Sequence, residues 1–218
     1  MKILIFGAHP DDEVIGVGGT IAKHVKEGDE VYLSILTDGV FAKHFGQDKF
    51  QRLKERKEDC LKVVKYLGIK EVFFHDLPDA KLDTLPQLEL NKLIENEIEK
   101  IKPDIVYTHN WSDLHRDHQL IFESTMVATR KNVKEVYCYE DICSTNLISG
   151  ANPFIPNVFV DISKEIKKKL KAMSYYKSTL EKFPHPLSLE SLEALAKYRG
   201  TQCGLTAAEA FVCVKKIK

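Results

Sequence analysis

The apolar and polar positions at the start of the chain predict strands that alternate with helices. A short apolar run at 2–8 predicts a buried strand, and apolar side chains at helical spacing over 13–26 predict a helix after it. A second apolar run at 31–37 predicts another strand, which ends at Asp38 and Gly39. This part of the chain therefore predicts one complete βαβ unit.

The same alternation continues to about residue 140. Apolar periodicity and short apolar runs predict helices at 50–67, 86–101 and about 117–130, and strands at 71–75, 104–108 and 135–139. Strands that alternate with helices favour an α/β fold. We expect a Rossmann-like, mostly parallel sheet with helices on both of its faces.

Beyond residue 140 the pattern is less regular. It indicates a strand at 158–161 and a lysine-rich helix at 163–181, whose charged side chains we expect to face solvent. The sequence shows no internal repeat, low-complexity segment or linker. We therefore expect a single domain over residues 1–218.

The charge balance limits the classes of partner. Lys+Arg and Asp+Glu both total 32, so the formal net charge is zero and gives no electrostatic indication of a nucleic-acid partner. No apolar stretch approaches the roughly 20 residues that span a bilayer. The apolar run at the N-terminus is too short for the core of a signal peptide. These features predict a cytoplasmic protein without an integral membrane segment.

The five cysteines form no CxxC pair, which favours reduced thiols over a disulfide framework or a zinc ribbon. Three of them, Cys60, Cys138 and Cys213, have apolar neighbours in the sequence. We expect these three to serve packing.

The first segment with candidate chemistry is Ala8-His9-Pro10-Asp11-Asp12-Glu13, between the first strand and the first helix. Ligands of open α/β sheets bind beyond the carboxyl ends of the strands, where this segment lies. Adjacent buried carboxylates repel one another, and a divalent cation bound by imidazole and carboxylate relieves that repulsion. The alternative is a solvated helix N-terminus, where acidic side chains favour the helix dipole. The segment has no GxGxxG pattern, and its negative charge would repel a pyrophosphate.

The second segment is His115-Arg116-Asp117-His118, after the strand predicted at 104–108. Neighbouring strands of a doubly wound sheet would place it beside the first segment. It then supplies a third metal ligand, together with a further imidazole and carboxylate. Three protein ligands and an open position are typical of catalytic zinc sites.

The two segments together resemble the PIG-L/LmbE family of zinc N-deacetylases, and the resemblance covers nearly the whole chain. Weaker matches follow in the expected order: Thr37-Asp38-Gly39, Leu77-Pro78-Asp79, Arg199-Gly200-Thr201-Gln202-Cys203-Gly204 and Ala208-Glu209-Ala210-Phe211. The resemblance implies that His9, Asp12 and His118 bind zinc. Fe²⁺ or Co²⁺ remains an alternative, because such sites are not sharply selective.

The resemblance also implies roles for neighbouring side chains. Asp11 resembles the general base that accepts a proton from the attacking water. His115 resembles the residue that stabilises the oxyanion or protonates the leaving amine. Asp117 would orient one of the histidines. Glu13 would be a structural or supporting carboxylate.

Three residues are candidates for substrate contact. Asp79 is suited to sugar hydroxyls, and Trp111 is suited to stacking on a sugar ring, with core packing as the alternative. Arg116 stands where the family often has proline, and it would suit an anionic substrate at the mouth of the site unless it is an ordinary surface residue. The segment 39–50, with its phenylalanines, is a candidate lid.

These features predict a metal-dependent hydrolase that removes the acetyl group of an N-acetyl amino sugar, such as N-acetylglucosamine, or of a sugar conjugate. One alternative is the same site acting on a non-sugar amide. Another is a catalytically silent metal-binding scaffold protein. The expected partner is a small N-acetylated sugar, and the sequence leaves open whether the protein forms a homo-oligomer.

Overall fold

A mostly parallel sheet organises the part of the chain that the computed structural model describes, residues 1–39, 48–145 and 153–218. Its strands lie in the order β3-β2-β1-β4-β5-β7-β6. The parallel strands are β1 (Lys2–Gly7), β2 (Glu30–Thr37), β3 (Glu71–Leu77), β4 (Ile105–Thr108) and β5 (Glu135–Tyr139). The strand β7 (Ala208–Lys216) runs antiparallel to both of its neighbours, β5 and β6 (Val158–Asp161).

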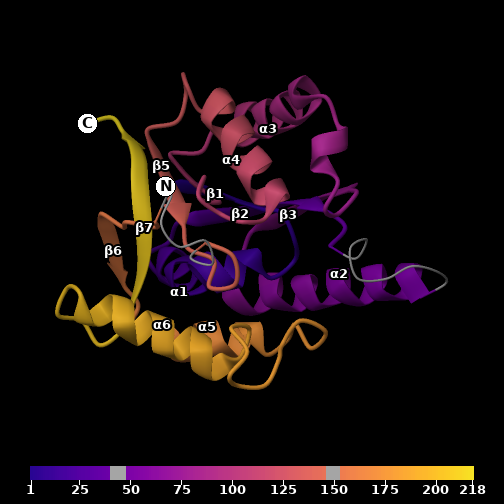
Figure 1. Ribbon diagram of the computed structural model, residues 1–218. Coiled ribbons are helices and arrows are strands. Elements are labelled where there is room, and N and C mark those ends of the chain that lie inside the picture. The colour runs from indigo at the N-terminus through magenta and orange to yellow at the C-terminus, as the bar shows by residue number, and fades with distance from the viewer. Residues whose placement is uncertain (40–47, 146–152) are drawn as a thin grey trace.

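Helices cover both faces of this sheet (Figure 1). One face carries α3 (Gln87–Ile101) and α4 (Arg116–Ala128), preceded by the short 3-10 helix η1 (Leu82–Thr84). The other face carries α1 (Asp12–Lys26), α2 (Asp48–Leu67), α5 (Ile166–Met173) and α6 (Leu189–Thr201). The prediction of an α/β, Rossmann-like fold is confirmed.

Two of the hydrophobic clusters, one on each face of the sheet, follow from the alternation of side chains along the strands. In β1, Ile3 and Ile5 are fully buried in the core beneath α1 and α2. Leu4 and Phe6 point to the opposite side and are fully buried beneath α3 and α4. A strand buried on both faces reads as a continuous apolar run, which is why its sequence shows no polar alternation.

The C-terminal third differs most from the predictions. The helix predicted at 163–181 was wrong in extent, because α5 ends at Met173 and turns follow. In these turns the buried side chain of Tyr176 contacts Glu13 of α1, a tertiary contact that helical periodicity does not reveal. The helix α6 and the antiparallel strand β7 were not predicted.

The expectation that the lysines of 163–181 all face solvent was also wrong. Lys169 is buried and donates to Glu209 Oε1 over 2.6 Å and to the carbonyl oxygen of Ile15 over 2.7 Å. The Glu209 carboxylate also accepts from the backbone N–H groups of Gly19 and Thr20. Burying a charge is costly unless it is paired and hydrogen-bonded, and this pair satisfies both conditions. It ties α5 and β7 to the middle of α1.

The glycines inside α1 allow close packing. A Cβ atom at Gly16 would lie 2.3 Å from a ring carbon of Tyr139 on β5, and one at Gly19 would lie 2.8 Å from Ile162. At Gly18 the nearest atoms, on Lys169 and Val14, are 3.2 Å away. Gly16 therefore sets how closely α1 approaches the sheet.

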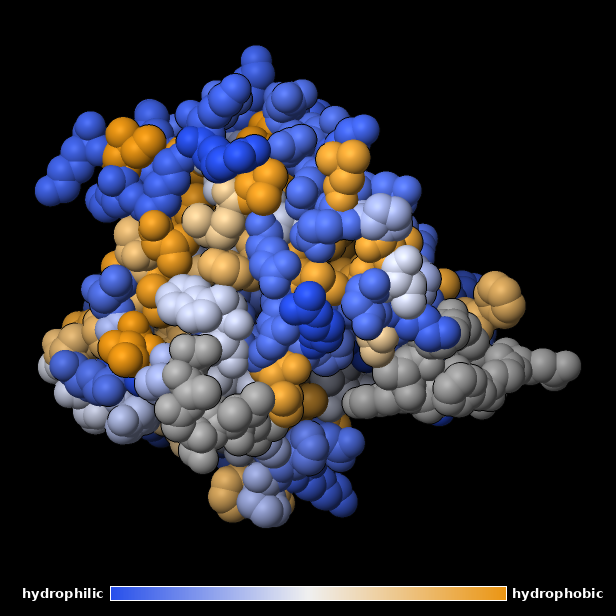
Figure 2. Space-filling view, turned by 45° about the horizontal axis from the view of Figure 1, so that its top comes forward, coloured by the Kyte–Doolittle hydropathy of each residue, from blue (hydrophilic) through white to orange (hydrophobic). Residues whose placement is uncertain are grey.

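The surface is mainly hydrophilic on the face shown in Figure 2, where hydrophobic residues form small groups between polar ones. Among the described residues, none of the helices combines the length and the apolar composition that crossing a bilayer requires. The candidate lid at 39–50 falls largely on residues 40–47, which lie outside the described part of the chain.

We expect Gly16→Ala to lower the free energy of unfolding by about 1–3 kcal/mol, because the added methyl group overpacks the contact with Tyr139. Gly18→Ala is the matched control. There the gain in helix propensity, about 1 kcal/mol, offsets the milder crowding. Urea denaturation of both variants measures the difference, and equal losses would contradict the tight approach at Gly16.

Candidate active site

The candidate site is a pocket of about 200 Å³ beyond the carboxyl ends of the central strands. Four segments that follow β1, β3, β4 and β5 supply most of its polar lining, and α2 and the segment between α5 and α6 add the rest. The pocket lining includes His9, Asp11, Asp12, Arg56, Asp79, His115, His118, Asp141, Thr179 and Leu187.

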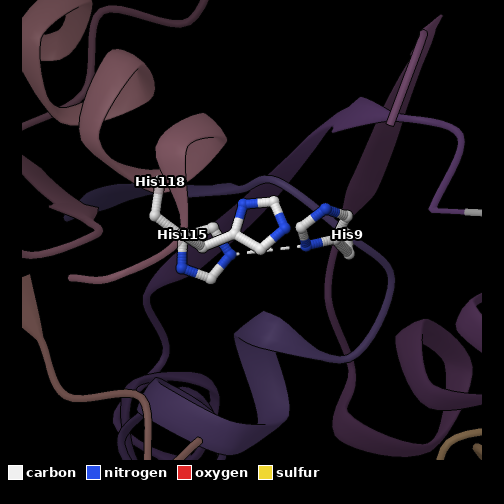
Figure 3. A group of neighbouring side chains, drawn as sticks. All are labelled: His9, His115 and His118. Atoms are coloured by element: carbon white, nitrogen blue, oxygen red, sulfur yellow. Dashed lines mark hydrogen bonds between the residues drawn. The ribbon is translucent and has the colours of Figure 1, made fainter. Parts of the chain in front are cut away.

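Three side chains from the two sequence motifs meet in this pocket. His9 Nδ1 lies 3.4 Å from His118 Nε2 (Figure 3). His9 Nδ1 also lies 3.6 Å from Asp12 Oδ2, and His118 Nε2 lies 3.8 Å from the same Asp12 oxygen. Donor atoms around a tetrahedral zinc ion, with bonds of about 2.0–2.2 Å, are about 3.3–3.6 Å apart. The spacing of these three atoms therefore fits one divalent metal ion.

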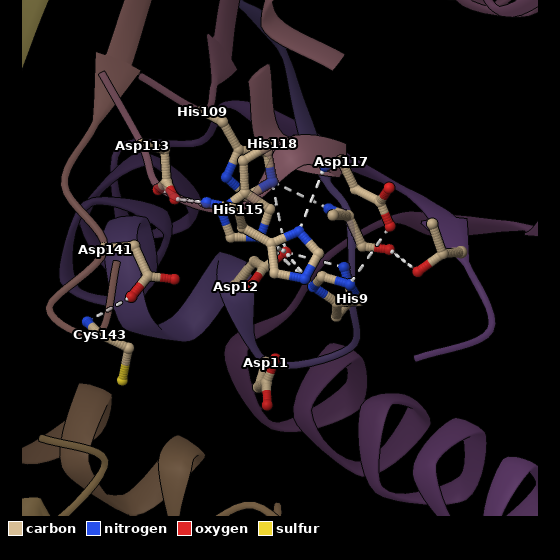
Figure 4. Close-up of polar contacts among 12 residues, drawn as sticks. His9, Asp11, Asp12, His109, Asp113, His115, Asp117, His118, Asp141 and Cys143 are labelled. Atoms are coloured by element: carbon tan, nitrogen blue, oxygen red, sulfur yellow. Dashed lines mark hydrogen bonds and ion pairs between the residues drawn. The ribbon is translucent and has the colours of Figure 1, made fainter. Parts of the chain in front are cut away.

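The outer nitrogens of both histidines face further carboxylates (Figure 4). His9 Nε2 lies 3.0 Å from Asp79 Oδ1, and His118 Nδ1 lies 3.1 Å from Asp113 Oδ2. Metal-bound histidines usually have such a partner, which fixes the ring and its tautomer. Although burial lowers the pKa of His9, hydrogen bonds that its ring donates to the carboxylates of Asp12 and Asp79 raise it to about 10. The site thus favours positive charge, which a divalent cation would also supply.

His109 supports the site from behind. Its ring is fully buried and stacks on His118 with 3.7 Å between ring centroids. Its Nε2 accepts from the backbone N–H of Ala8 and lies 3.3 Å from Asp12 Oδ2. Burial, together with the charge of His118, lowers the pKa of His109 to about 4. This neutral ring packs against the donor atoms without lining the pocket.

Asp11 lies on the pocket wall beside this cluster, at the start of α1. Its carboxylate is buried, and Oδ2 accepts from Arg56 over 3.2 Å. Burial raises the pKa of Asp11, and the charge of Arg56 opposes that rise. Asp11 also has a φ of 131°, which L-residues rarely adopt.

His115 is the residue at the N-terminal cap of α4, where its Nδ1 accepts from the backbone N–H of Asp117 over 3.3 Å. Its ring centroid lies 4.8 Å from that of His9 and 4.7 Å from that of His118. Burial, followed by the charges of His118 and His9, lowers the pKa of His115. In a neutral ring whose Nδ1 accepts a hydrogen bond, Nε2 carries the proton.

Asp117 has a different environment from the one expected. Its carboxylate accepts from the backbone N–H groups of Ala80 and Leu82, over 2.7 Å and 3.1 Å. It lies 3.9 Å from His9 Nε2, farther than Asp79 does. Asp117 therefore fixes the loop that carries Asp79, and contacts the histidine only at longer range.

Two of the three candidate substrate contacts do not lie among the lining residues. Arg116 is half exposed and contacts Gln119 and Glu123 of its own helix, over 2.9 Å and 3.5 Å. Trp111 is 40% exposed and packs against Phe122 with 5.6 Å between ring centroids. Asp79 does line the pocket, where it contacts His9.

Several lining or supporting residues were missed from the sequence. Arg56 lies in a strongly charged helix, and nothing in the local sequence distinguishes it from the other charged residues there. Asp113 gave a usable signal, because it stands two residues before His115 in the same polar loop. Asp141 follows β5, and burial raises its pKa to about 7. Asp141 could have been predicted as a site residue from its position just after the strand predicted at 135–139.

The fold and the pocket define an α/β protein with a histidine–carboxylate site that fits a divalent metal. Comparison with known proteins agrees with this class. Residues 4–129 match the model of the PIG-L family, described as GlcNAc-PI de-N-acetylase. The chain therefore belongs to the PIG-L family, as the sequence motifs predicted.

Individual relatives cover nearly the whole chain. Diacetylchitobiose deacetylase of Thermococcus kodakarensis is 30% identical over 227 residues, which cover 95% of this chain and 81% of the relative. The solved structure of N,N'-diacetylchitobiose deacetylase from Pyrococcus horikoshii is 25% identical with a TM-score of 0.79, covering 98% of this chain and 84% of that one.

A second similar structure has a different activity. GalB, the 4-carboxy-2-hydroxymuconate hydratase from Pseudomonas putida, has a TM-score of 0.80 at 20% identity, and covers 100% of this chain and 97% of that one. This likeness shows a shared fold alone. The fold alone therefore does not determine the reaction, which depends on the side chains of the site.

The geometry predicts that the protein binds about one divalent metal ion per chain, and that His118→Ala abolishes this binding because it removes one of three donors. His75→Ala is the matched control, since His75 contacts Glu97 and does not line the pocket. Elemental analysis after purification without chelators measures the metal. Full retention in His118→Ala would contradict this donor set.

Proposed function

We propose that this protein is a metal-dependent N-deacetylase that hydrolyses the acetamide group of an N-acetyl amino sugar or sugar conjugate. The observation that carries the proposal is the meeting of His9, Asp12 and His118 in one pocket that Asp11 and His115 also line. The relatives' activity on diacetylchitobiose supports the substrate class.

His9, Asp12 and His118 would hold the metal through the three atoms that face one another. A bound divalent ion such as zinc would lower the pKa of water to about 7 and polarise the amide carbonyl. Imidazole and carboxylate donors also bind Fe²⁺ or Co²⁺. We propose zinc because it suits these donors and the hydrolysis of an amide.

Asp11 is the proposed general base. Its carboxylate lies on the pocket wall, and the raised pKa that burial gives it favours acceptance of a proton during the reaction. The contact with Arg56 holds one carboxylate oxygen, Oδ2, at 3.2 Å. The carboxylate is the proposed acceptor of the proton of the attacking water.

His115 is the proposed partner of the acetamide oxygen. Since its Nδ1 accepts from the Asp117 N–H, its Nε2 carries the proton of the neutral ring. Donation from Nε2 stabilises the negative charge that develops on the carbonyl oxygen. The leaving amine nitrogen, which needs a proton to depart, takes the one that Asp11 has accepted from the attacking water.

The carboxylates behind the histidines are the proposed positioning groups. We assign the orientation of His9 to Asp79 and that of His118 to Asp113, while the backbone N–H of Asp117 orients His115. Asp117 acts indirectly, because it holds the N–H groups of Ala80 and Leu82 beside Asp79.

The central test measures acetate release from GlcNAc, diacetylchitobiose, GlcNAc-malate and UDP-GlcNAc by the metal-loaded protein. We expect release from at least one of them. We expect Asp11→Asn to lower kcat by about 10²–10⁴-fold while the metal is retained, because the base is lost. Asp104→Asn, at the opposite end of the sheet, is the control.

Each alternative has a distinct result in this test. Metal binding without acetate release from any sugar would move the proposal to a non-sugar amide. Metal binding without hydrolysis of any amide would indicate a silent scaffold. A fully active Asp11→Asn variant would remove Asp11 from the role of base.

We further expect Asp113→Asn to weaken metal binding by about 10–100-fold, because the variant loses the negative charge beside His118 Nδ1. Competition with a chromogenic chelator measures the metal Kd. Asp83→Asn, on the exposed side of η1, is the control. An unchanged Kd in Asp113→Asn would show that Asp113 stabilises its own loop and does not contribute to metal binding.

A further inference from the structure

The backbone of Asp11 is unusual for the residue that we assign as base. Its φ of 131° and ψ of −28° lie outside the regions that L-residues ordinarily occupy. Such conformations persist only where the surrounding structure over-determines them, and they are frequent at functional sites. The contacts around Asp11 therefore indicate what maintains this conformation.

The peptide group between Pro10 and Asp11 is held at both of its polar ends. Its carbonyl oxygen, on Pro10, accepts from Arg56 Nη2 over 2.8 Å. Its N–H, on Asp11, donates to Glu13 Oε2 over 3.1 Å. Rotation of this peptide plane would break both hydrogen bonds. The orientation of the plane determines φ of Asp11, and so the direction in which its side chain leaves the backbone.

Glu13 is itself fixed by a partner from a distant part of the chain. Its Oε1 accepts from the hydroxyl of Tyr176 over 2.5 Å, and both side chains are fully buried. Tyr176 lies in the turns after α5, where its backbone N–H donates to the carbonyl oxygen of Met173. These turns continue to Thr179, which lines the pocket. A hydrogen-bonded path thus joins Tyr176 to the Asp11 backbone through Glu13.

We propose that Glu13, held by Tyr176, is a positioning residue that fixes the Pro10–Asp11 peptide plane and thereby aims the Asp11 carboxylate into the pocket. This inference rests on the proposed function of Asp11 as the base. Glu13 acts through the Asp11 backbone and does not line the pocket itself.

An ordinary helix cap makes a different prediction. A carboxylate in the first turn often accepts from the backbone N–H at the cap, and its loss lowers the stability of the helix. A cap that serves stability alone would change the melting temperature and leave kcat unchanged. A positioning residue changes kcat, because a displacement of about 1 Å at a reacting group can cost about 10²-fold in rate.

The first experiment compares the steady-state kinetics of three variants of the metal-loaded enzyme. We expect Glu13→Ala to lower kcat by about 10²-fold with little change in KM or metal content. Glu13→Gln retains an acceptor for the Asp11 N–H and should remain within about tenfold of wild type. Tyr176→Phe should fall between them. Glu97→Ala removes a buried glutamate remote from the pocket, and its kcat should be unchanged.

A double-mutant cycle separates positioning from general damage. In the Asp11→Asn background, Glu13→Gln and Tyr176→Phe should produce no further loss of kcat, because the carboxylate that they position is absent. Additive losses would overturn the proposal, as would wild-type kcat in Glu13→Ala. Glu13→Gln and Tyr176→Phe preserve most of the buried volume, so the cycle does not depend on the folding of the alanine variant.

A crystal structure of Glu13→Gln and one of Glu13→Ala test the inference without reference to activity. We expect φ of Asp11 to stay positive in the glutamine variant and to move to a common negative value in the alanine variant. A φ near 131° in Glu13→Ala would overturn the positioning role, whatever the substrate proves to be. If the wild type hydrolyses no amide while φ changes as expected, the proposed function fails and the backbone clamp stands.

Discussion

Charge balance around Asp12 is the constraint on which the site depends. Its Oδ2 lies 3.6 Å and 3.8 Å from ring nitrogens of His9 and His118, which come from segments after β1 and β4. Burying a carboxylate is costly without such partners. Because β1 and β4 are neighbours in the sheet, their carboxyl ends bring these groups together. Asp79 and Asp113 then place a second negative charge beside each histidine, on the side away from Asp12.

The position of α1 is the second requirement, and the C-terminal third of the chain provides it. The pair of Lys169 and Glu209 binds the backbone in the middle of α1, and Gly16 allows the helix to approach Tyr139. Tyr176 reaches the start of the same helix through Glu13. The end of the chain thus shapes a site whose proposed ligands all come from the first part.

The reaction depends on a small number of side chains within a widely used fold. A hydratase shares this architecture at 20% identity, so the sheet and its helices alone do not specify deacetylation. Amide hydrolysis is favoured by the proposed metal ligands together with the Asp11 carboxylate and the His115 imidazole, whose pKa values are shifted in opposite directions. Burial raises the pKa of Asp11, which suits it to accept a proton. Burial lowers the pKa of His115, whose neutral ring is suited to donate a hydrogen bond.

The sequence by itself determined the parallel strands, most of the helices and the grouping of His9, Asp12 and His118. Apolar periodicity is a local property, and motifs that follow neighbouring parallel strands must meet at one edge of the sheet. Only the tertiary structure decided that Arg56 reaches Asp11, that Tyr176 reaches Glu13, and that Arg116 and Trp111 lie away from the pocket. Such contacts join segments far apart in the chain, and their geometry is set by packing, which no local pattern of residues encodes.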